Sequence, residues 1–255
     1  MEIISLNIIK GGCAKTTTVQ AFAEILGGKF KKRVLVIDTD LQCSLTIVSG
    51  IDPMEHQDHN LYTLLHGEST IDQCIIKGKY YDIIPASTFL SYVESEFSDH
   101  SKGHFLILKN KLEDLKESYD YVFIDTPPAL GIMNIMSLTA SDKVIIPTEC
   151  SYLAIKGLEH LAKTIEGVKK HANKNLEITG IFLVKFKKRY NLDQGILYNL
   201  QDISSRMHTK VFDKKIRETT KIGEAQCMMS PLIEYEPKCT AFKDYIALTK
   251  EIFSV

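Results

Sequence analysis

Side chains of the types that bind phosphate are concentrated between residues 10 and 17 of the sequence, which holds two glycines, two lysines and two threonines there. This segment follows an apolar, strand-like run at 3–9 and precedes a run with apolar residues at helical spacing. A glycine-containing loop between a strand and a helix binds anions, because its backbone amides converge and the helix dipole adds partial positive charge. Lys15 can neutralise phosphate oxygens, and the Thr16 hydroxyl can bind Mg²⁺. The sequence therefore predicts a phosphate-binding loop, although a plain strand-to-helix turn would also use these glycines.

The loop departs from the common pattern G-x-x-x-x-G-K-[ST] at both of its glycines, which are replaced by Ile9 and Ala14. It resembles instead the variant K-G-G-x-x-K-T-T, the deviant Walker A loop of the ParA/MinD class of ATPases, which carries an additional lysine, here Lys10. The resemblance implies that Lys15 serves ATP in its own subunit, whereas Lys10 reaches the nucleotide of a partner subunit, and that both lysines are catalytic. The implied nucleotide-binding residues are Lys10, Gly11, Gly12, Cys13, Ala14, Lys15, Thr16 and Thr17.

Ala14 places a methyl group where the backbone must pass close to phosphate and where glycine often adopts a positive φ. That conformation costs other residues about 1–2 kcal/mol. We therefore expect Ala14→Gly to tighten ATP binding or to raise turnover.

Aspartates follow two further hydrophobic runs, with Asp38 and Asp40 after the first and Asp125 after the second. Continuous hydrophobicity indicates strands that are buried on both faces of a parallel sheet, and residues at the carboxyl ends of such strands face the ligand edge. The resemblance implies that Asp40 orients the attacking water and that Asp125, together with Thr16, holds Mg²⁺. Taken alone, these aspartates could instead cap the helix or turn that follows.

The composition favours one α/β domain spanning residues 1–255, without a global charge that would attract a polyanion. Apolar residues make up 44% of the chain, enough for a sizeable core, and 31 basic residues nearly balance 32 acidic ones. Any nucleic-acid surface must therefore be a local patch. The six cysteines include no C-x-x-C pair, which favours a reducing cytosol over a zinc site or a disulfide framework. No signal peptide is apparent, and no apolar run approaches the roughly 20 residues of a membrane span.

Strand-like runs alternate with helical patterns along the whole chain. The alternation predicts a doubly wound, mostly parallel sheet of about seven strands with helices on both faces, as in P-loop NTPases, with the nucleotide at its carboxyl edge. The predicted strands lie near residues 3–9, 33–38, 80–84, 120–125, 143–147, 178–184 and 209–213.

Two basic clusters lie in the C-terminal half of this otherwise neutral chain. Several cations that reach phosphates are enough for nonspecific DNA binding, although ordinary surface charge has the same composition. The resemblance to partition ATPases favours a DNA-binding face. Its candidate residues are Lys187, Lys188, Arg189, Lys214, Lys215, Arg217 and Lys221.

The resemblance to ParA-type partition ATPases extends from Lys10 to the last predicted helix. It implies a weak, Mg²⁺-dependent ATPase of the cytoplasm and nucleoid. With ATP the protein would form a sandwich homodimer that binds double-stranded DNA nonspecifically, and hydrolysis, stimulated by a centromere-binding adaptor of the ParB type, would release the DNA.

Both ends of the sequence also bear on this resemblance. No long segment precedes the loop, so we expect the short, Soj-like form. The final residues carry no basic amphipathic extension of the kind by which MinD relatives bind membranes, so we expect no membrane partner. Three alternatives stay open: a positioning ATPase for another cellular cargo, a small-molecule ATP-dependent ligase of the same fold, and a reductase that resembles the nitrogenase iron protein.

Overall fold

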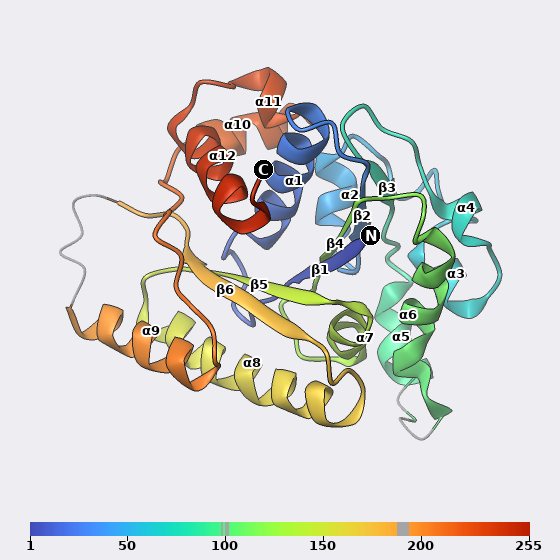
Figure 1. Cartoon of the computed structure of the whole chain (residues 1–255). Helices are drawn as coiled ribbons and strands as arrows, with labels where there is room; N and C mark the ends of the chain where they lie inside the picture. Colours follow the sequence, from blue (N-terminus) through green and yellow to red (C-terminus); the bar gives the residue numbers. More distant parts are fainter. Residues whose placement is uncertain (98, 100–101, 188–193) are drawn as a thin grey trace.

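A parallel sheet forms the centre of the molecule in the computed structural model, which describes residues 1–97, 99, 102–187 and 194–255 (Figure 1). Its described strands are β1 (Glu2–Leu6), β2 (Val34–Asp38), β3 (Asp82–Ile84), β4 (Tyr121–Asp125), β5 (Lys143–Thr148) and β6 (Glu177–Leu183). They lie in the order β3-β2-β4-β1-β5-β6, and every neighbouring pair is parallel. The carboxyl ends of all these strands therefore meet at one edge of the sheet.

The six described strands confirm the predicted runs, but the prediction of a seventh strand at 209–213 is wrong. In that segment Val211 forms only an isolated parallel bridge with Ile181. Phe212 is the one residue of the segment that is buried, so the segment lacks the repeated apolar positions that hold a strand against a core. Its backbone therefore follows the edge of β6 without extending the sheet.

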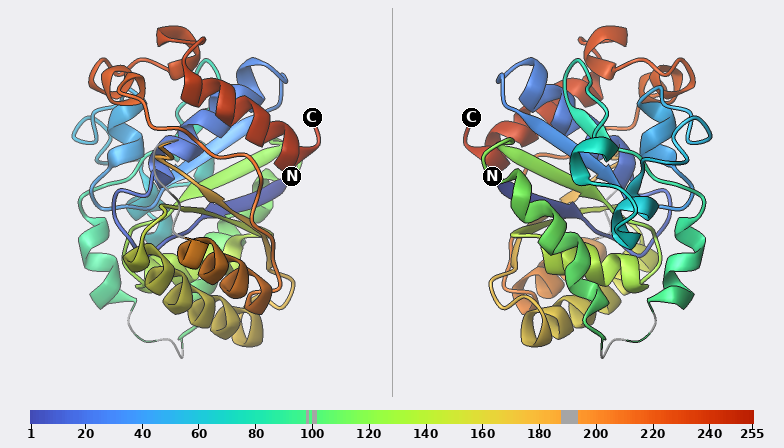
Figure 2. Two further views of the ribbon diagram at one scale, coloured as in Figure 1. Left: turned by 90° about the vertical axis from the view of Figure 1, so that its left-hand side faces the viewer. Right: turned by 90° about the vertical axis from the view of Figure 1, so that its right-hand side faces the viewer.

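Helices cover both faces of the sheet (Figure 1; Figure 2). The first face is covered by α1 (Lys15–Gly28), α2 (Ser44–Val48), α10 (Lys221–Cys227), α11 (Leu232–Tyr235) and α12 (Thr240–Phe253). The opposite face is covered by α3 (Leu61–His66), α4 (Ile71–Cys74), α5 (Leu90–Glu96), α6 (Ile107–Leu112), α7 (Ile132–Ala140), α8 (Tyr152–His171) and α9 (Gln194–Arg206), with the 3₁₀ turns η2 (His104–Leu106) and η3 (Glu113–Leu115) beside α6. None of the helices among the described residues combines the length and the apolar character needed to cross a bilayer.

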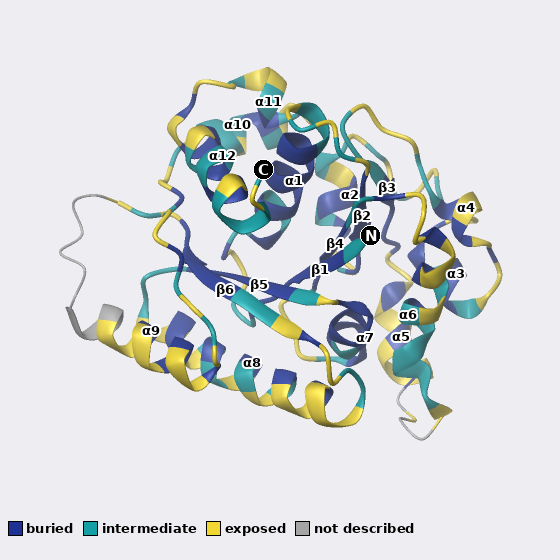
Figure 3. Cartoon of the chain, in the orientation of Figure 1, coloured by how far each residue is buried: buried dark blue, intermediate teal, exposed yellow. Residues whose placement is uncertain are grey.

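Alternation of side chains along each strand builds a core on both faces. Ile4 of β1 and Val36 of β2 pack with α1 and α12, whereas their neighbours Ile3 and Leu35 pack with the helices of the opposite face. The strands are consequently buried along most of their length, whereas the first three residues of β6 are exposed or partly exposed (Figure 3). This burial confirms the doubly wound arrangement that the continuous apolar runs predict.

Candidate functional site

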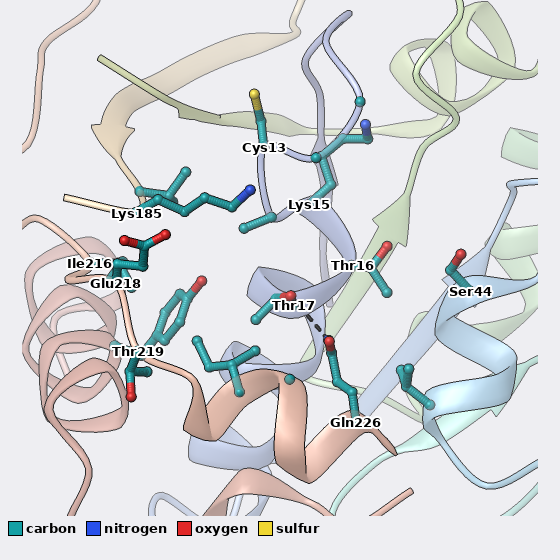
Figure 4. Close-up of a pocket in the computed structure, with 18 of the residues that line it drawn as sticks. Cys13, Lys15, Thr16, Thr17, Ser44, Lys185, Ile216, Glu218, Thr219 and Gln226 are labelled. Atoms are coloured by element: carbon teal, nitrogen blue, oxygen red, sulfur yellow. Dashed lines mark hydrogen bonds between the residues drawn. The ribbon is translucent and has the colours of Figure 1, made fainter. Parts of the chain in front are cut away.

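The loop between β1 and α1 borders an open cavity of about 570 Å³ at the carboxyl edge of the sheet. Residues 11–17 line one side of this cavity, and residues 216–219, with Ile222 and Gln226, line the other. Figure 4 shows Lys15, Thr16 and Thr17 at the start of α1 facing the cavity, with Lys185 and Glu218 across from them. A cavity of this volume is in the range that holds a nucleotide-sized ligand.

The backbone of the loop turns through two residues with positive φ. Gly12 has φ 81°, and Ala14, immediately before α1, has φ 57° and ψ 31°. The left-handed conformation expected at Ala14 is therefore confirmed. Alanine holds this conformation at a cost of about 1–2 kcal/mol relative to its preferred backbone angles.

Lys15 lies at the floor of the cavity with only 8% of its surface exposed. Its Nζ donates a hydrogen bond to the Ile8 carbonyl at 3.3 Å. Burial lowers the pKa of Lys15, and the nearby carboxylates of Asp125 and Asp40 oppose that effect. A buried ammonium group with a single backbone acceptor has donors left for the oxygens of a phosphate.

Thr16 and Asp125 meet at the carboxyl ends of β1 and β4. The Thr16 hydroxyl donates a hydrogen bond to Asp125 Oδ2 at 2.6 Å, and Asp125 is only 1% exposed. Its second oxygen, Oδ1, is buried and has no hydrogen-bond partner in the described part of the chain. Burial raises the pKa of Asp125, and the charge of Asp38 adds to that rise. An orphaned carboxylate oxygen beside a threonine hydroxyl fits Mg²⁺, which takes one or two protein ligands and fills its remaining positions with water and phosphate.

Asp38 and Asp40 follow β2 but have different surroundings. Asp38 is fully buried and accepts hydrogen bonds from the Thr46 backbone N–H at 2.9 Å and from the Thr46 hydroxyl at 2.8 Å. Asp40 is half-buried, lines the cavity and accepts a hydrogen bond from the Gln42 N–H at 3.0 Å. The alternative that these aspartates cap the following helix therefore applies to Asp38, which anchors α2. Asp40 instead faces the space where a nucleotide would lie.

Lys10 is absent from the cavity lining of its own subunit. Its Nζ donates a hydrogen bond to Glu149 Oε2 at 2.6 Å and lies 3.4 Å from the Ser151 hydroxyl. The other oxygen of Glu149 lies 3.1 Å from Lys185 Nζ. The hydrogen bond to Glu149 raises the pKa of Lys10. The two lysines of the loop are thus separated, with one in the cavity and one on a carboxylate beside it.

Sequence reasoning missed three residues of this site: Glu149, Lys185 and Gln226. Glu149 follows β5 and Lys185 follows β6. Residues at the carboxyl ends of parallel strands face the ligand edge, and this rule, which predicted Asp38, would also have predicted both of them. Gln226 of α10 donates a hydrogen bond to the Thr17 hydroxyl at 3.1 Å, which Figure 4 marks by a dashed line. No local pattern indicates this contact, because it joins residues 209 positions apart.

The described members of the two basic clusters lie side by side, as a single face requires. The Phe186 N–H donates to the Ile216 carbonyl at 2.9 Å, and the Glu218 N–H donates to the Phe186 carbonyl at 3.1 Å. This pairing brings Lys187 next to the segment 214–221. Lys188 and Arg189 lie outside the described residues.

Carboxylates pair with several cations of this face. Arg217 makes a bidentate contact with Asp244 of α12, with Nε at 2.8 Å and Nη2 at 2.6 Å from its oxygens. Lys187 pairs with Glu218, and Lys221 pairs with Glu224. Within the described residues no ion pair involves Lys214 or Lys215, and the Lys215 ammonium lies 5.0 Å from the centre of the Phe186 ring. The positive charge available to a ligand is consequently smaller than the residue count suggests.

Known proteins resemble this chain over nearly its whole length. A protein-family model described as an AAA domain matches residues 1–178. The sporulation initiation inhibitor protein Soj of Bacillus subtilis is 34% identical over 254 residues and covers 98% of both chains. The chromosome partitioning protein ParA of Caulobacter vibrioides is 31% identical over 258 residues, which are 100% of this chain and 94% of that one.

A solved structure of cobyrinic acid a,c-diamide synthase from Mycobacterium smegmatis, with bound ATP analog and magnesium, has the same fold. It superposes with a TM-score of 0.86 at 26% identity and covers 99% of this chain and 94% of its own. The sequence relatives and the architecture of the site both agree with the nucleotide-binding loop predicted at residues 10–17. The chain therefore belongs to the ParA/Soj family of partition ATPases, P-loop proteins built on one mostly parallel sheet.

Proposed function

We propose that the chain, acting as one domain over residues 1–255, partitions DNA through an ATP-driven cycle of dimerisation. The observation that carries this proposal is the position of Lys10, which lies outside its own cavity and is held at the ligand edge by Glu149. A lysine in that position could reach the nucleotide of a second subunit after it leaves Glu149. ATP would then lie between two subunits and join them.

Hydrolysis in such a site is a matter of positioning and of charge neutralisation. Lys15 binds the phosphates from its own subunit, and Lys10 of the partner adds a second positive charge. Asp40 orients the attacking water. Thr16 and Asp125 would hold Mg²⁺, which supplies further neutralisation of the phosphate charge. The ATPase is weak by itself because each site lacks one lysine until two subunits meet.

Exposed apolar side chains beside Lys10 support a dimer face at this edge. Tyr152 and Leu153 begin α8, directly after Ser151, and they are 63% and 69% exposed. Apolar groups clustered at a polar rim are typical of surfaces that a protein partner covers.

Nonspecific double-stranded DNA is the proposed partner of the ATP-bound dimer. The basic face adjoins the cavity, since Arg217, Glu218 and Thr219 line the cavity wall. A dimer doubles the number of cations that reach one duplex, so dimerisation raises the affinity steeply. An adaptor of the ParB type stimulates turnover and thereby releases the DNA, and the protein works in the cytoplasm on the nucleoid.

DNA affinity measured in three nucleotide states tests this proposal. We expect a duplex of mixed sequence to bind tightly with a nonhydrolysable ATP analogue and weakly with ADP or without nucleotide. Lys15→Ala is the matched control, because its affinity should stay at the nucleotide-free value under every condition. Equal affinity of the wild type in all three states would contradict the proposal.

A small-molecule ligase is a second candidate, and one observation favours it. A further cavity of about 290 Å³ adjoins the first and is lined by Glu149, Ser151 and Lys185 among others. By analogy with the diamide synthase, a ligase would bind its carboxylic acid substrate in this space. If ADP release requires a small carboxylic acid and is unaffected by DNA, the result would support the ligase function over DNA partition.

Positioning of another cellular cargo would use the same ATP cycle. The identity of the neighbouring genes would distinguish cargo positioning from DNA partition. An adjacent gene for a small DNA-binding protein, with repeated DNA sites nearby, is expected for partition.

A further inference from the structure

Glu149 is shared by two lysines, of which the proposed dimer cycle uses only one. Its Oε2 accepts the hydrogen bond from Lys10 Nζ at 2.6 Å, and its Oε1 lies 3.1 Å from Lys185 Nζ. Glu149 is the less exposed member of both pairs, with 20% of its side chain exposed against 31% for Lys10 and 47% for Lys185. The proposed function requires Lys10 to leave this carboxylate, after which Lys185 is the cation that stays paired with it in the described part of the chain.

The adjoining ends of β5 and β6 keep Lys185 beside Glu149. The Val184 N–H, directly after β6, donates to the carbonyl of Thr148, the last residue of β5, at 2.9 Å. Glu149 and Lys185 follow these two residues directly, so the pairing of the strands fixes the distance between their backbones. Lys10 belongs instead to the loop between β1 and α1. Lys10 can therefore leave the carboxylate while Lys185 keeps its place.

The backbone of Lys185 has a conformation that indicates a functional constraint. Its φ is 52°, in the left-handed region that residues other than glycine seldom occupy, and the next residue, Phe186, donates its N–H to the Ile216 carbonyl at 2.9 Å. The Lys185 side chain extends toward the phosphate-binding loop (Figure 4), and its Nζ lies 3.8 Å from the position that a Cβ atom on Gly12 would take. Strained backbone angles concentrate at functional sites, so this placement favours a role for Lys185 in the nucleotide cycle.

The charges around Glu149 balance when Lys10 is absent. The charged residues in the described lining of the adjoining cavity of about 290 Å³ are Glu149, Lys185, Lys187 and Glu218. Lys187 pairs with Glu218, and Lys185 pairs with Glu149. Lys10 is a third cation beside these two carboxylates. Its departure consequently leaves two cations with two carboxylates, and no unpaired negative charge faces the phosphates of the nucleotide.

Lys185 and Lys10 both hold Glu149 in its charged form. Burial acts to raise the pKa of Glu149, but hydrogen bonds from the two lysines outweigh that effect and lower the pKa below its ordinary value. A carboxylate that loses both cations would be a partly buried, unpaired charge beside the nucleotide, which is unfavourable. We propose that Lys185 is a positioning residue of the dimer cycle: it neutralises Glu149 and thereby lets Lys10 pass to the nucleotide of the partner subunit.

The role of Lys185 rests on the proposed dimer cycle, and it predicts that Lys185→Gln has the opposite effect to Glu149→Gln. Without Lys185, the departure of Lys10 leaves the carboxylate alone, so Glu149 holds Lys10 more firmly. A dimer releases two Lys10 side chains, and the dissociation constant of the dimer should therefore rise roughly 10-fold. In the Glu149→Gln background no carboxylate needs to be neutralised, so Lys185→Gln should change the dissociation constant by less than about twofold.

Sedimentation equilibrium with a nonhydrolysable ATP analogue and Mg²⁺ measures this constant for the wild type, the two single variants and the double variant. Lys143→Gln is the matched control, since it removes one lysine from a partly exposed pair with Glu2 at the opposite end of β5. The control should dimerise like the wild type. Lys185→Arg, which keeps the positive charge, should do so too. Thermal unfolding curves establish that every variant is folded.

Two results would overturn the role of Lys185 and leave the dimer cycle intact. One is a dissociation constant of Lys185→Gln equal to that of the wild type. The other is an equal weakening by Lys185→Gln with and without the Glu149 carboxylate, which would mean that Lys185 acts on the nucleotide or on the partner directly. A wild type that stays monomeric with the ATP analogue would instead contradict the dimer cycle itself, and the role of Lys185 with it, so the two failures are distinguishable.

Discussion

Replacing Glu149 by glutamine should strengthen ATP-dependent dimerisation, because the carboxylate holds Lys10 within its own subunit. The two groups are 2.6 Å apart, and their side chains are 31% and 20% exposed. A partly exposed ion pair of this kind is worth about 1 kcal/mol. A dimer breaks two such pairs, so Glu149→Gln saves about 2 kcal/mol per dimer, which corresponds to a roughly 30-fold lower dissociation constant.

Sedimentation velocity with a nonhydrolysable ATP analogue measures this dissociation constant. Glu159→Gln is the matched control, since it also removes one carboxylate near the start of α8, where Glu159 pairs with Lys156 at 2.9 Å. The control should dimerise like the wild type. If Glu149→Gln dimerises no better than Glu159→Gln, then Lys10 does not have to leave Glu149 on the way to the dimer, and the reasoning is refuted.

Three further predictions concern the loop, the core and the basic face. Ala14→Gly should raise the free energy of unfolding by about 1 kcal/mol and tighten ATP binding, because glycine adopts the left-handed conformation without strain. Thermal unfolding and ATP titration test this prediction, and identical values for the wild type and the variant would contradict it. Burial raises the pKa of Glu24 from 4.5 to about 7, so the wild type should lose about 3 kcal/mol of stability relative to Glu24→Gln as the pH rises from 4.5 to about 7. Chemical denaturation at several pH values measures this, and a difference in unfolding free energy between the two proteins that does not change with pH would contradict the prediction. Lys214→Ala should lower the salt slope of DNA binding by about one and leave stability unchanged. Arg217→Ala should destabilise the fold by about 1–3 kcal/mol, because Asp244 loses both guanidinium hydrogen bonds and keeps, within the described chain, only the one from the backbone N–H of residue 217; equal melting temperatures for these two variants would contradict the distinction.

Local sequence patterns predicted the features of the site that depend on neighbouring residues. The glycine loop, Lys15 and Thr16 are contiguous, and Asp125 ends an unbroken apolar run, so their arrangement follows from one strand, one turn and one helix. The left-handed angle of Ala14 could be predicted for the same reason. These elements specify a phosphate site before any tertiary contact is considered.

Contacts between distant residues could not be predicted in this way. The bond between Lys10 and Glu149 joins residues 139 positions apart, and its geometry depends on how β1 and β5 pair. The pairing of Arg217 with Asp244 likewise depends on where α12 packs, and it shows that a basic cluster in the sequence is not a measure of available charge. The prediction of a strand at 209–213 was wrong because this segment has too few apolar residues to pack along the sheet.

The most direct test of the account is the dependence of ATP turnover on protein concentration. If Lys10 of one subunit completes the site of another, turnover per subunit should rise with concentration until the dimer is fully formed, and Lys10→Ala should remove that rise while leaving ATP bound to the monomer. A turnover per subunit that is constant over the whole concentration range, and equal in the wild type and Lys10→Ala, would contradict the two-subunit site.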